Sequence, residues 1–291
     1  MMQNMVQKVK KAKKAKKLYN DESYKDEGVM TMTFSECVEN QIGMEQIGEK
    51  CKFGFSYEDL LSAKSYFEKL GCVCELICLN DLIEEDDSVE KAYILIMRNS
   101  VDKIYENEKC KKKKEDLYNE LKMLAWDDRY WDTRRGRVLN KNARVNMCVS
   151  DFSQEANYEA KKGTVYNFKD LNLLNIIRKN LNNVGKAFEN MNAEGNWYYN
   201  LVNCGIGFHG DVERKKVLGV RLGMKSMNLC FKWFQNSKSF GKMFETILNP
   251  GDMYIMSDKA GGSDWKKRSK KSLRHCCGGE KWMKKVLKSM K

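Results

Sequence analysis

The second half of the chain is built from short apolar runs separated by turn residues. From residue 126 onward, segments rich in β-branched and aromatic residues alternate with Gly, Asn and Asp, a pattern typical of strands. Only one helix, at about residues 171–190, is expected among them. Many short strands with few helices predict a barrel or sandwich with helices packed outside it. The expected strands are 138–140, 146–149, 164–168, 197–202, 217–222, 228–234, 244–248 and 252–256.

The preceding residues have a different pattern. Apolar residues at helical spacing predict a helix over residues 56–70, which Gly71 would end, and a lysine-rich helix over residues 101–124. Short apolar runs at residues 73–79 and 93–97 are typical of strands. We therefore expect three parts: a basic arm over residues 1–30, a small α/β N-terminal domain over residues 31–125, and a second domain over residues 126–291.

Composition limits the class of protein. The chain is 42% hydrophobic and has a single proline, which excludes a disordered or collagen-like chain. No run approaches the ~18 apolar residues that a transmembrane helix needs, so we expect no membrane partner. The eleven cysteines are scattered and odd in number, which favours free thiols over a disulfide framework. An intracellular protein, cytoplasmic or nuclear, is expected.

The net charge of +13 is concentrated at the two ends of the chain. Residues 1–20 carry +7 and residues 259–291 carry +10, while the residues between them carry −4. Clustered positive charge attracts nucleic acid by releasing its counterions, so DNA or RNA is the expected partner. A solubilising tail or a nuclear-import signal would explain the N-terminal lysines as well.

The chain contains only two histidines, His209 and His275. His209 belongs to an H-x-D step with Asp211, and on a strand this spacing points both side chains to the same face. Two imidazoles and one carboxylate are the facial triad of non-haem Fe(II) oxygenases, which leaves coordination positions open for cosubstrate and O2. An H-x-D step alone is also explained by an ordinary, partly buried histidine.

The order of motifs around these histidines resembles the AlkB-like branch of the 2-oxoglutarate/Fe(II) dioxygenases. Asn196-Trp197-Tyr198 matches an N-x-Y motif thirteen residues before His209. A strand ending in Leu222-Gly223, an aromatic strand, a turn with Gly251-Asp252 and the distal His275 follow in the family's order. The resemblance covers roughly residues 190–280.

The resemblance implies an α+β protein whose catalytic core is a double-stranded β-helix, or jelly roll, with packed helices. His209, Asp211 and His275 would bind Fe(II), and Asn196 and Tyr198 would hydrogen-bond the 2-oxoglutarate. The implied reaction consumes O2, converts 2-oxoglutarate to succinate, and hydroxylates or oxidatively demethylates a nucleic-acid base. Beyond the metal ligands no catalytic side chain is expected.

One feature departs from the family. Its members place an arginine after the distal histidine, where it pairs with the far carboxylate of 2-oxoglutarate, whereas only lysines follow His275 here. Lysine supplies charge without the two-pronged geometry that suits a carboxylate. Arg221, set in an otherwise apolar strand, is the preferred substitute, although an outward charge on a half-exposed strand would look the same.

Several other residues could bind ligands. Arg134 and Arg135 lie in a segment that interleaves arginines with aromatics, a combination that suits bases and phosphates. A second basic cluster, directly before the distal histidine, consists of Lys266, Lys267, Arg268, Lys270 and Lys271. The cysteines lack the paired C-x2-C spacing of a zinc site. A 2-oxoglutarate-dependent protein hydroxylase and a non-catalytic nucleic-acid-binding protein are the alternative functions.

Overall fold

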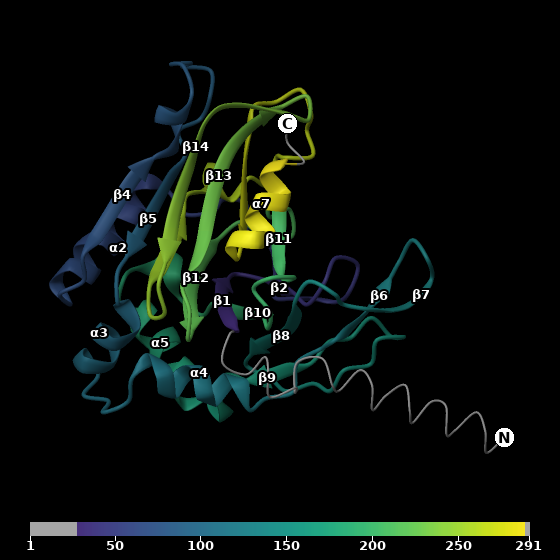
Figure 1. Cartoon of the computed structure of the whole chain (residues 1–291). Helices are drawn as coiled ribbons and strands as arrows, with labels where there is room; N and C mark the ends of the chain where they lie inside the picture. Colours follow the sequence, from purple (N-terminus) through teal and green to yellow (C-terminus); the bar gives the residue numbers. More distant parts are fainter. Residues whose placement is uncertain (1–27, 289–291) are drawn as a thin grey trace.

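The computed structural model describes residues 28–288 and shows a mixed α+β protein with two large, mostly antiparallel sheets (Figure 1). The basic arm expected over residues 1–30 lies, except for its last three residues, outside the described range. Among the described residues, no helix is both long and apolar enough to cross a lipid bilayer. All eleven cysteines are free thiols, as the scattered spacing predicted.

The larger sheet has eight strands and the smaller has four. The larger runs, in spatial order, β4 (Cys74–Cys78), β5 (Tyr93–Met97), β15 (Met253–Met256), β12 (Val217–Gly223), β1 (Val29–Ser35), β10 (Asn192–Tyr198), β8 (Val145–Ser150) and β9 (Val165–Asn167). The smaller runs β11 (Gly205–His209), β16 (Ser272–Gly278), β13 (Met227–Gln235) and β14 (Lys238–Leu248). Two hairpins stand apart, β2 (Val38–Glu39) with β3 (Gln46–Ile47) and β6 (Arg129–Asp132) with β7 (Arg137–Asn140).

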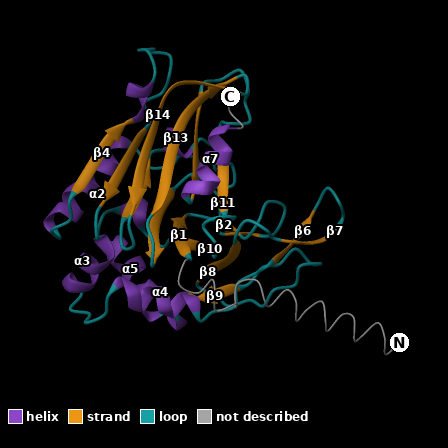
Figure 2. Cartoon of the chain, in the orientation of Figure 1, coloured by secondary structure: helices purple, strands orange, loops and turns teal. Residues whose placement is uncertain are grey.

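Helices cover one side of the larger sheet (Figure 2). α4 packs on β12 and against α5, which also packs against α3, while α2 packs on β4 and β5. These helices are α2 (Tyr57–Lys69), α3 (Ser100–Asn107), α4 (Lys114–Lys122) and α5 (Asn172–Leu181). Two further helices, α6 (Asp258–Gly261) and α7 (Glu280–Lys288), pack against β16. The short 3-10 helices are η2 (Leu79–Leu82), η3 (Phe168–Asp170) and η4 (Lys186–Phe188).

The N-terminal strand β1 lies in the middle of the larger sheet. It pairs antiparallel with β12 on one side and with β10 on the other. β4 and β5, which also precede residue 126, extend the same sheet through the pairing of β5 with β15. The ranges 31–125 and 126–291 therefore both contribute strands to the larger sheet.

The alternation of side chains along β1 assigns each face of the sheet a different role. Met30, Met32 and Phe34 are fully buried on the helix side, where Phe34 stacks with Phe168 at a centroid distance of 6.3 Å. Thr31 and Thr33 alternate with them and line a cavity on the opposite side. The apolar core and the polar cavity are thus separated by the thickness of one sheet.

Most of the expected elements are present, with three corrections. The strands at 73–79, 93–97, 217–222 and 228–234 and the helix at 56–70 agree with the structure to within a few residues. The single helix expected over 101–124 is two helices, because the chain turns at Lys109 with φ 54° before the lysine run. The helix expected over 171–190 ends at Leu181, and the strand expected over 197–202 is instead β10.

Candidate metal centre

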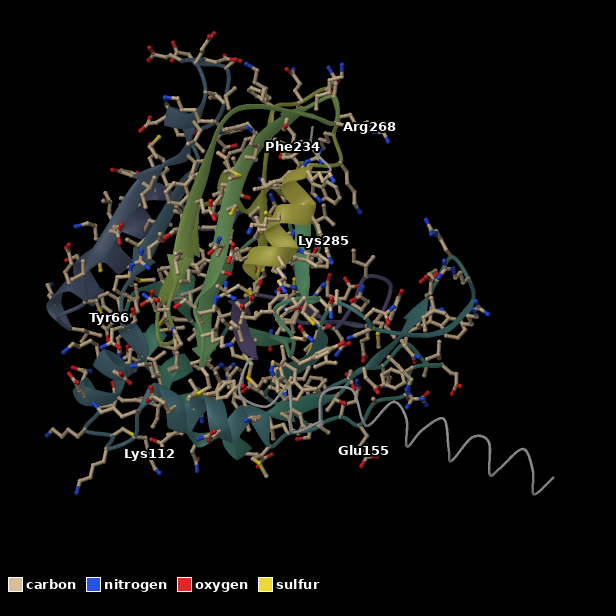
Figure 3. The ribbon with its side chains drawn as sticks, viewed as in Figure 1. Tyr66, Lys112, Glu155, Phe234, Arg268 and Lys285 are labelled. Atoms are coloured by element: carbon tan, nitrogen blue, oxygen red, sulfur yellow. The ribbon has the colours of Figure 1, made fainter. Side chains whose placement is uncertain are left out.

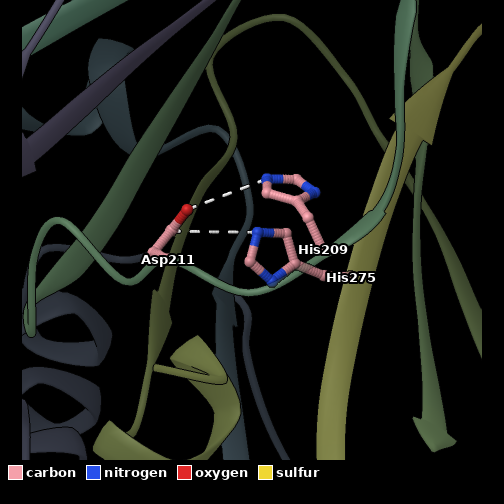
Figure 4. A group of neighbouring side chains, drawn as sticks. All are labelled: His209, Asp211 and His275. Atoms are coloured by element: carbon pink, nitrogen blue, oxygen red, sulfur yellow. Dashed lines mark ion pairs between the residues drawn. The ribbon is translucent and has the colours of Figure 1, made fainter. Parts of the chain in front are cut away.

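His209, Asp211 and His275 converge at one point (Figure 4). β11 and β16 are neighbours, and their register places His209 opposite His275 with ring centroids 4.4 Å apart. Asp211 follows β11 in a loop, and its carboxylate oxygens lie 3.7 Å from His209 Nε2 and 3.8 Å from His275 Nε2. The three candidate ligand atoms lie within 4.8 Å of one another, and no other such cluster of His, Cys, Asp or Glu occurs in residues 28–288.

Both imidazoles present a nitrogen suited to metal binding. His209 Nδ1 lies 2.8 Å from Gly207 O, a contact that holds the proton on Nδ1 and leaves the Nε2 lone pair free. Burial lowers the pKa of His275 well below its usual value, and the charges of His209 and Arg214 lower it further, so this ring is neutral. Two imidazoles and one carboxylate, with space beside them, fit the ferrous facial triad.

A cavity of about 260 Å³ adjoins these three residues. Its wall includes Asn196 and Tyr198, the two residues that the resemblance assigns to hydrogen bonds with the cosubstrate. Asn196 is held from three sides: Oδ1 accepts hydrogen bonds from Arg144 and Asn146, and Nδ2 donates to Glu194 at 2.9 Å. Tyr198 is buried, and its hydroxyl accepts a hydrogen bond from Cys277 at 3.3 Å.

Arg221 points inward, as the preferred interpretation of its strand required. Only 1% of the surface of Arg221 is exposed, and its Nη1 donates a hydrogen bond to Thr31 Oγ1 at 2.7 Å. Nε has no hydrogen-bond partner, and no carboxylate in residues 28–288 forms an ion pair with Arg221. Thr31 separates this guanidinium from the cavity, because Thr31 contributes to the cavity wall and Arg221 does not.

A buried ion pair in the cavity wall was not expected from the sequence. Arg214 and Glu194 are 4% and 5% exposed and are joined through Nη2 and Oε2, while Glu213 lies 3.3 Å from the same nitrogen. The polar face of β1 was not expected either. Alternating Thr31 and Thr33 in an otherwise apolar strand could have revealed that face.

The basic cluster before His275 adjoins the cavity through Trp265, which lines it. Lys266, Lys267, Arg268 and Lys270 are exposed in the loop that leads to β16, whereas Lys271 pairs with Asp86 at 2.5 Å. The Arg268 carbonyl accepts a hydrogen bond from the backbone N–H of Asn236, and Figure 3 shows Arg268 at the same end of the molecule as Phe234 of β13. The loop is thus fixed to the β13–β14 turn of the smaller sheet.

Arg134 and Arg135 are exposed at the turn of the β6–β7 hairpin. This hairpin lies beside the 40–43 loop, since a Cβ added to Gly43 would come within 2.5 Å of Thr133 Oγ1. Ile42, in the same loop, lines the cavity. The predicted nucleic-acid-binding residues do not line the cavity themselves. One group follows Trp265, which does, and the other lies on a hairpin beside the 40–43 loop.

Comparison with known proteins identifies a viral relative. No family model matches the chain. Over 257 residues it is 40% identical to an uncharacterized protein of Acanthamoeba polyphaga mimivirus, a match that spans 88% of this chain and 97% of the viral protein. The chain belongs to the family of this mimivirus protein. That relative carries no described activity, so an assignment of function depends on the site itself.

Proposed function

We propose that the protein is an AlkB-like Fe(II)/2-oxoglutarate-dependent dioxygenase that hydroxylates or oxidatively demethylates a nucleic-acid base. The observation that carries the proposal is the convergence of His209, Asp211 and His275 beside a cavity lined by Asn196 and Tyr198. These three residues would hold Fe(II), which would supply the activation of O2 and the oxidation of a C–H bond.

The order of strands supports a double-stranded β-helix, or jelly roll. From β10 to β16 the chain alternates between the larger and the smaller sheet, except for the β13–β14 hairpin. In a complete jelly roll, an eighth strand would follow β16 and would pair in the larger sheet between β10 and β12. In this protein β1 occupies that position. With β1 in that position, β15, β12, β1 and β10 of the larger sheet and the four strands of the smaller sheet would form the two sheets of a jelly roll.

This topology accounts for the missing arginine after His275. The chain continues from β16 into α7 instead of into another strand of the larger sheet. A carboxylate anchor must therefore come from another element, and Arg221, on the strand beside β1, is the candidate. For Arg221 to meet the cosubstrate directly, the Thr31 side chain would have to turn away from it.

Charge around the cavity fits a doubly negative ligand. Four carboxyl groups lie in the cavity wall, and one of them, Glu39, is protonated below pH 7 because burial raises its pKa to about 7. The other three, Asp211, Glu194 and Glu213, are then matched in number by Arg144 and Arg214 in the wall and by Arg221 behind Thr31. A divalent cation would add two positive charges, which a dicarboxylate such as 2-oxoglutarate would neutralise. Low-polarity surroundings make such neutralisation energetically important.

A nucleic-acid substrate is supported by the exposed basic loop at residues 266–270. Trp265, at the start of this loop, lines the cavity and lies over Arg274, with 5.1 Å between the guanidinium carbon and the ring centroid. Aromatic and arginine faces stack on bases, while flexible lysines neutralise phosphates. The loop could therefore hold the strand on either side of a base that enters the cavity.

The experiment that tests this proposal measures the succinate formed when the Fe(II)-reconstituted protein is incubated with 2-oxoglutarate, O2 and ascorbate. We expect single-stranded oligonucleotides with N-methylated bases to stimulate succinate and release formaldehyde, and Asp211→Ala to abolish both products. Asp151→Ala, which alters a surface ion pair with Arg178, is the matched control and should retain both. Retained turnover in Asp211→Ala would overturn the assignment, and stimulation by peptides alone would redirect it to a protein hydroxylase.

A further inference from the structure

We propose that Arg144, in the cavity wall, is a second carboxylate-binding residue that acts together with Arg221, which is hydrogen-bonded to Thr31 of the same wall. This inference rests on the proposed function and deepens it, because it assigns the recognition of the distal carboxylate to a loop outside the segment that resembles the dioxygenases. Arg144 lies in the loop between β7 and β8, at residues 141–144.

The contacts of Arg144 leave most of its guanidinium available. Nε donates to Asn196 Oδ1 at 2.5 Å, and no ion pair in the described range 28–288 includes this arginine. Arg144 contributes to the cavity wall together with Asn196, Tyr198 and Thr31. A guanidinium that is fixed through Nε presents its two remaining nitrogens as a fork, the geometry that binds a carboxylate through two hydrogen bonds.

Asn196 acts as the support for this arginine. Its Oδ1 also accepts from Asn146 Nδ2 at 2.7 Å, and its Nδ2 donates to the buried Glu194. These contacts fix the orientation of the amide, and the amide in turn fixes Arg144 Nε. Asn196 therefore serves as a positioning residue for Arg144, in place of the direct cosubstrate contact expected from its motif.

Arg144 and Arg221 place two positive charges around one buried hydroxyl. Burial raises the pKa of Tyr198 well above its usual value, while the charges of Arg144 and Arg221 both act in the opposite direction. Arg144 lines the cavity together with Tyr198, and Arg221 is hydrogen-bonded to Thr31, which lines the same cavity. Arg221 is almost fully buried with an unsatisfied Nε, and an uncompensated buried cation is costly. A bound anion would relieve that cost.

The ligand class follows from the position of the two arginines. A 2-oxo acid held at the metal centre by its keto and adjacent carboxylate oxygens would direct the rest of its chain into the cavity. Arg144 would then distinguish a dicarboxylate, whose far end carries a negative charge, from a monocarboxylate that ends in a methyl group. We therefore assign to Arg144 a selectivity for dicarboxylic over monocarboxylic 2-oxo acids.

The test is calorimetric binding of 2-oxoglutarate and of pyruvate to the Mn(II)-loaded protein. We expect Arg144→Gln to weaken 2-oxoglutarate binding about 10-fold or more, the cost of a charged hydrogen bond. Pyruvate affinity should change less than about twofold, because pyruvate lacks the far carboxylate that Arg144 would meet. Arg144→Lys should recover part of the loss, since it restores charge without the fork. Arg137→Gln, an exposed arginine of the neighbouring hairpin, is the control and should leave both affinities unchanged.

The outcomes separate this inference from the proposed function. If Arg144→Gln binds 2-oxoglutarate as tightly as the unmodified protein, or loses both ligands equally, the inference is wrong while the enzyme assignment stands. If the unmodified protein binds Mn(II) but neither 2-oxo acid, the dioxygenase proposal itself fails and this inference fails with it. Retained Mn(II) binding in each variant verifies that the site is still folded.

Discussion

Arg221 of β12 donates a hydrogen bond to Thr31 of β1, a residue 190 positions earlier in the chain, with 2.7 Å between Nη1 and Oγ1. This contact joins the first strand of the fold to the strand that follows the H-x-D step. It also places the hydroxyl of Thr31 between the buried guanidinium and the cavity. The N-terminal strand is therefore both a central part of the sheet and a wall of the candidate site.

Met32 tests the position of β1 in the core. Met32 is fully buried on the helix side of this strand, and truncation of a buried methionine to alanine costs about 2–5 kcal/mol. We expect Met32→Ala to lower the free energy of unfolding by that amount in urea titrations. Met123→Ala is the matched control: Met123 is 85% exposed, and its truncation should change stability by less than about 0.5 kcal/mol. Equal stability of the two variants would exclude a core position for β1.

Glu39, in the cavity wall, gives a pH prediction. Burial raises its pKa to about 7, and the nearby Glu213 and Glu194 raise it too, although Oε1 accepts a hydrogen bond from Gly43 N. The folded state therefore holds a proton that the unfolded chain releases near 4.5, so this group makes the metal-free protein less stable as pH rises from about 4.5 to about 7.

Replacement of this carboxyl should remove its share of the pH dependence. We expect Glu39→Gln to gain stability relative to the unmodified protein between pH 5 and pH 7.5, as measured by urea unfolding in the presence of EDTA. Stability curves that stay parallel across this range would show that Glu39 does not titrate there.

The basic loop gives a prediction about salt dependence. Each lysine that neutralises a phosphate of single-stranded nucleic acid contributes about 0.7 to the slope of log affinity against log salt. We expect the triple variant Lys266→Gln, Lys267→Gln, Lys270→Gln to reduce that slope by about 2. Lys271→Gln should have little effect on the slope, because Lys271 already pairs with Asp86. Binding assays between 50 and 200 mM salt would decide, and an unchanged slope in the triple variant would place the nucleic acid elsewhere.

The sequence predicted the local elements better than their arrangement. Strands such as β12 and β13 could be found because their apolar runs are continuous and bounded by turns. β1 was missed because it directly follows the lysine-rich arm, and nothing local reveals that Val29–Ser35 pairs with strands more than 150 residues away. The split of the 101–124 helix was missed because charged residues favour helix in isolation, whereas Lys109 adopts a positive φ in the turn.

The same distinction applies to the candidate site. His209, Asp211 and His275 were predictable because the chain has only two histidines and one of them belongs to an H-x-D step. Arg144 and the Arg214–Glu194 pair were not, because their roles depend on which loops reach the cavity after folding. Sequence spacing identifies residues on one strand, but it does not reveal which distant side chains complete the same cavity.

Titration of the metal-free protein with Mn(II), followed by electron paramagnetic resonance, tests the central claim most directly. The account predicts one bound ion per chain, loss of that binding in both His275→Ala and Asp211→Ala, and retention of it in Asp151→Ala. Tight binding that persists in Asp211→Ala and His275→Ala, or no stoichiometric binding by the unmodified protein, would contradict it.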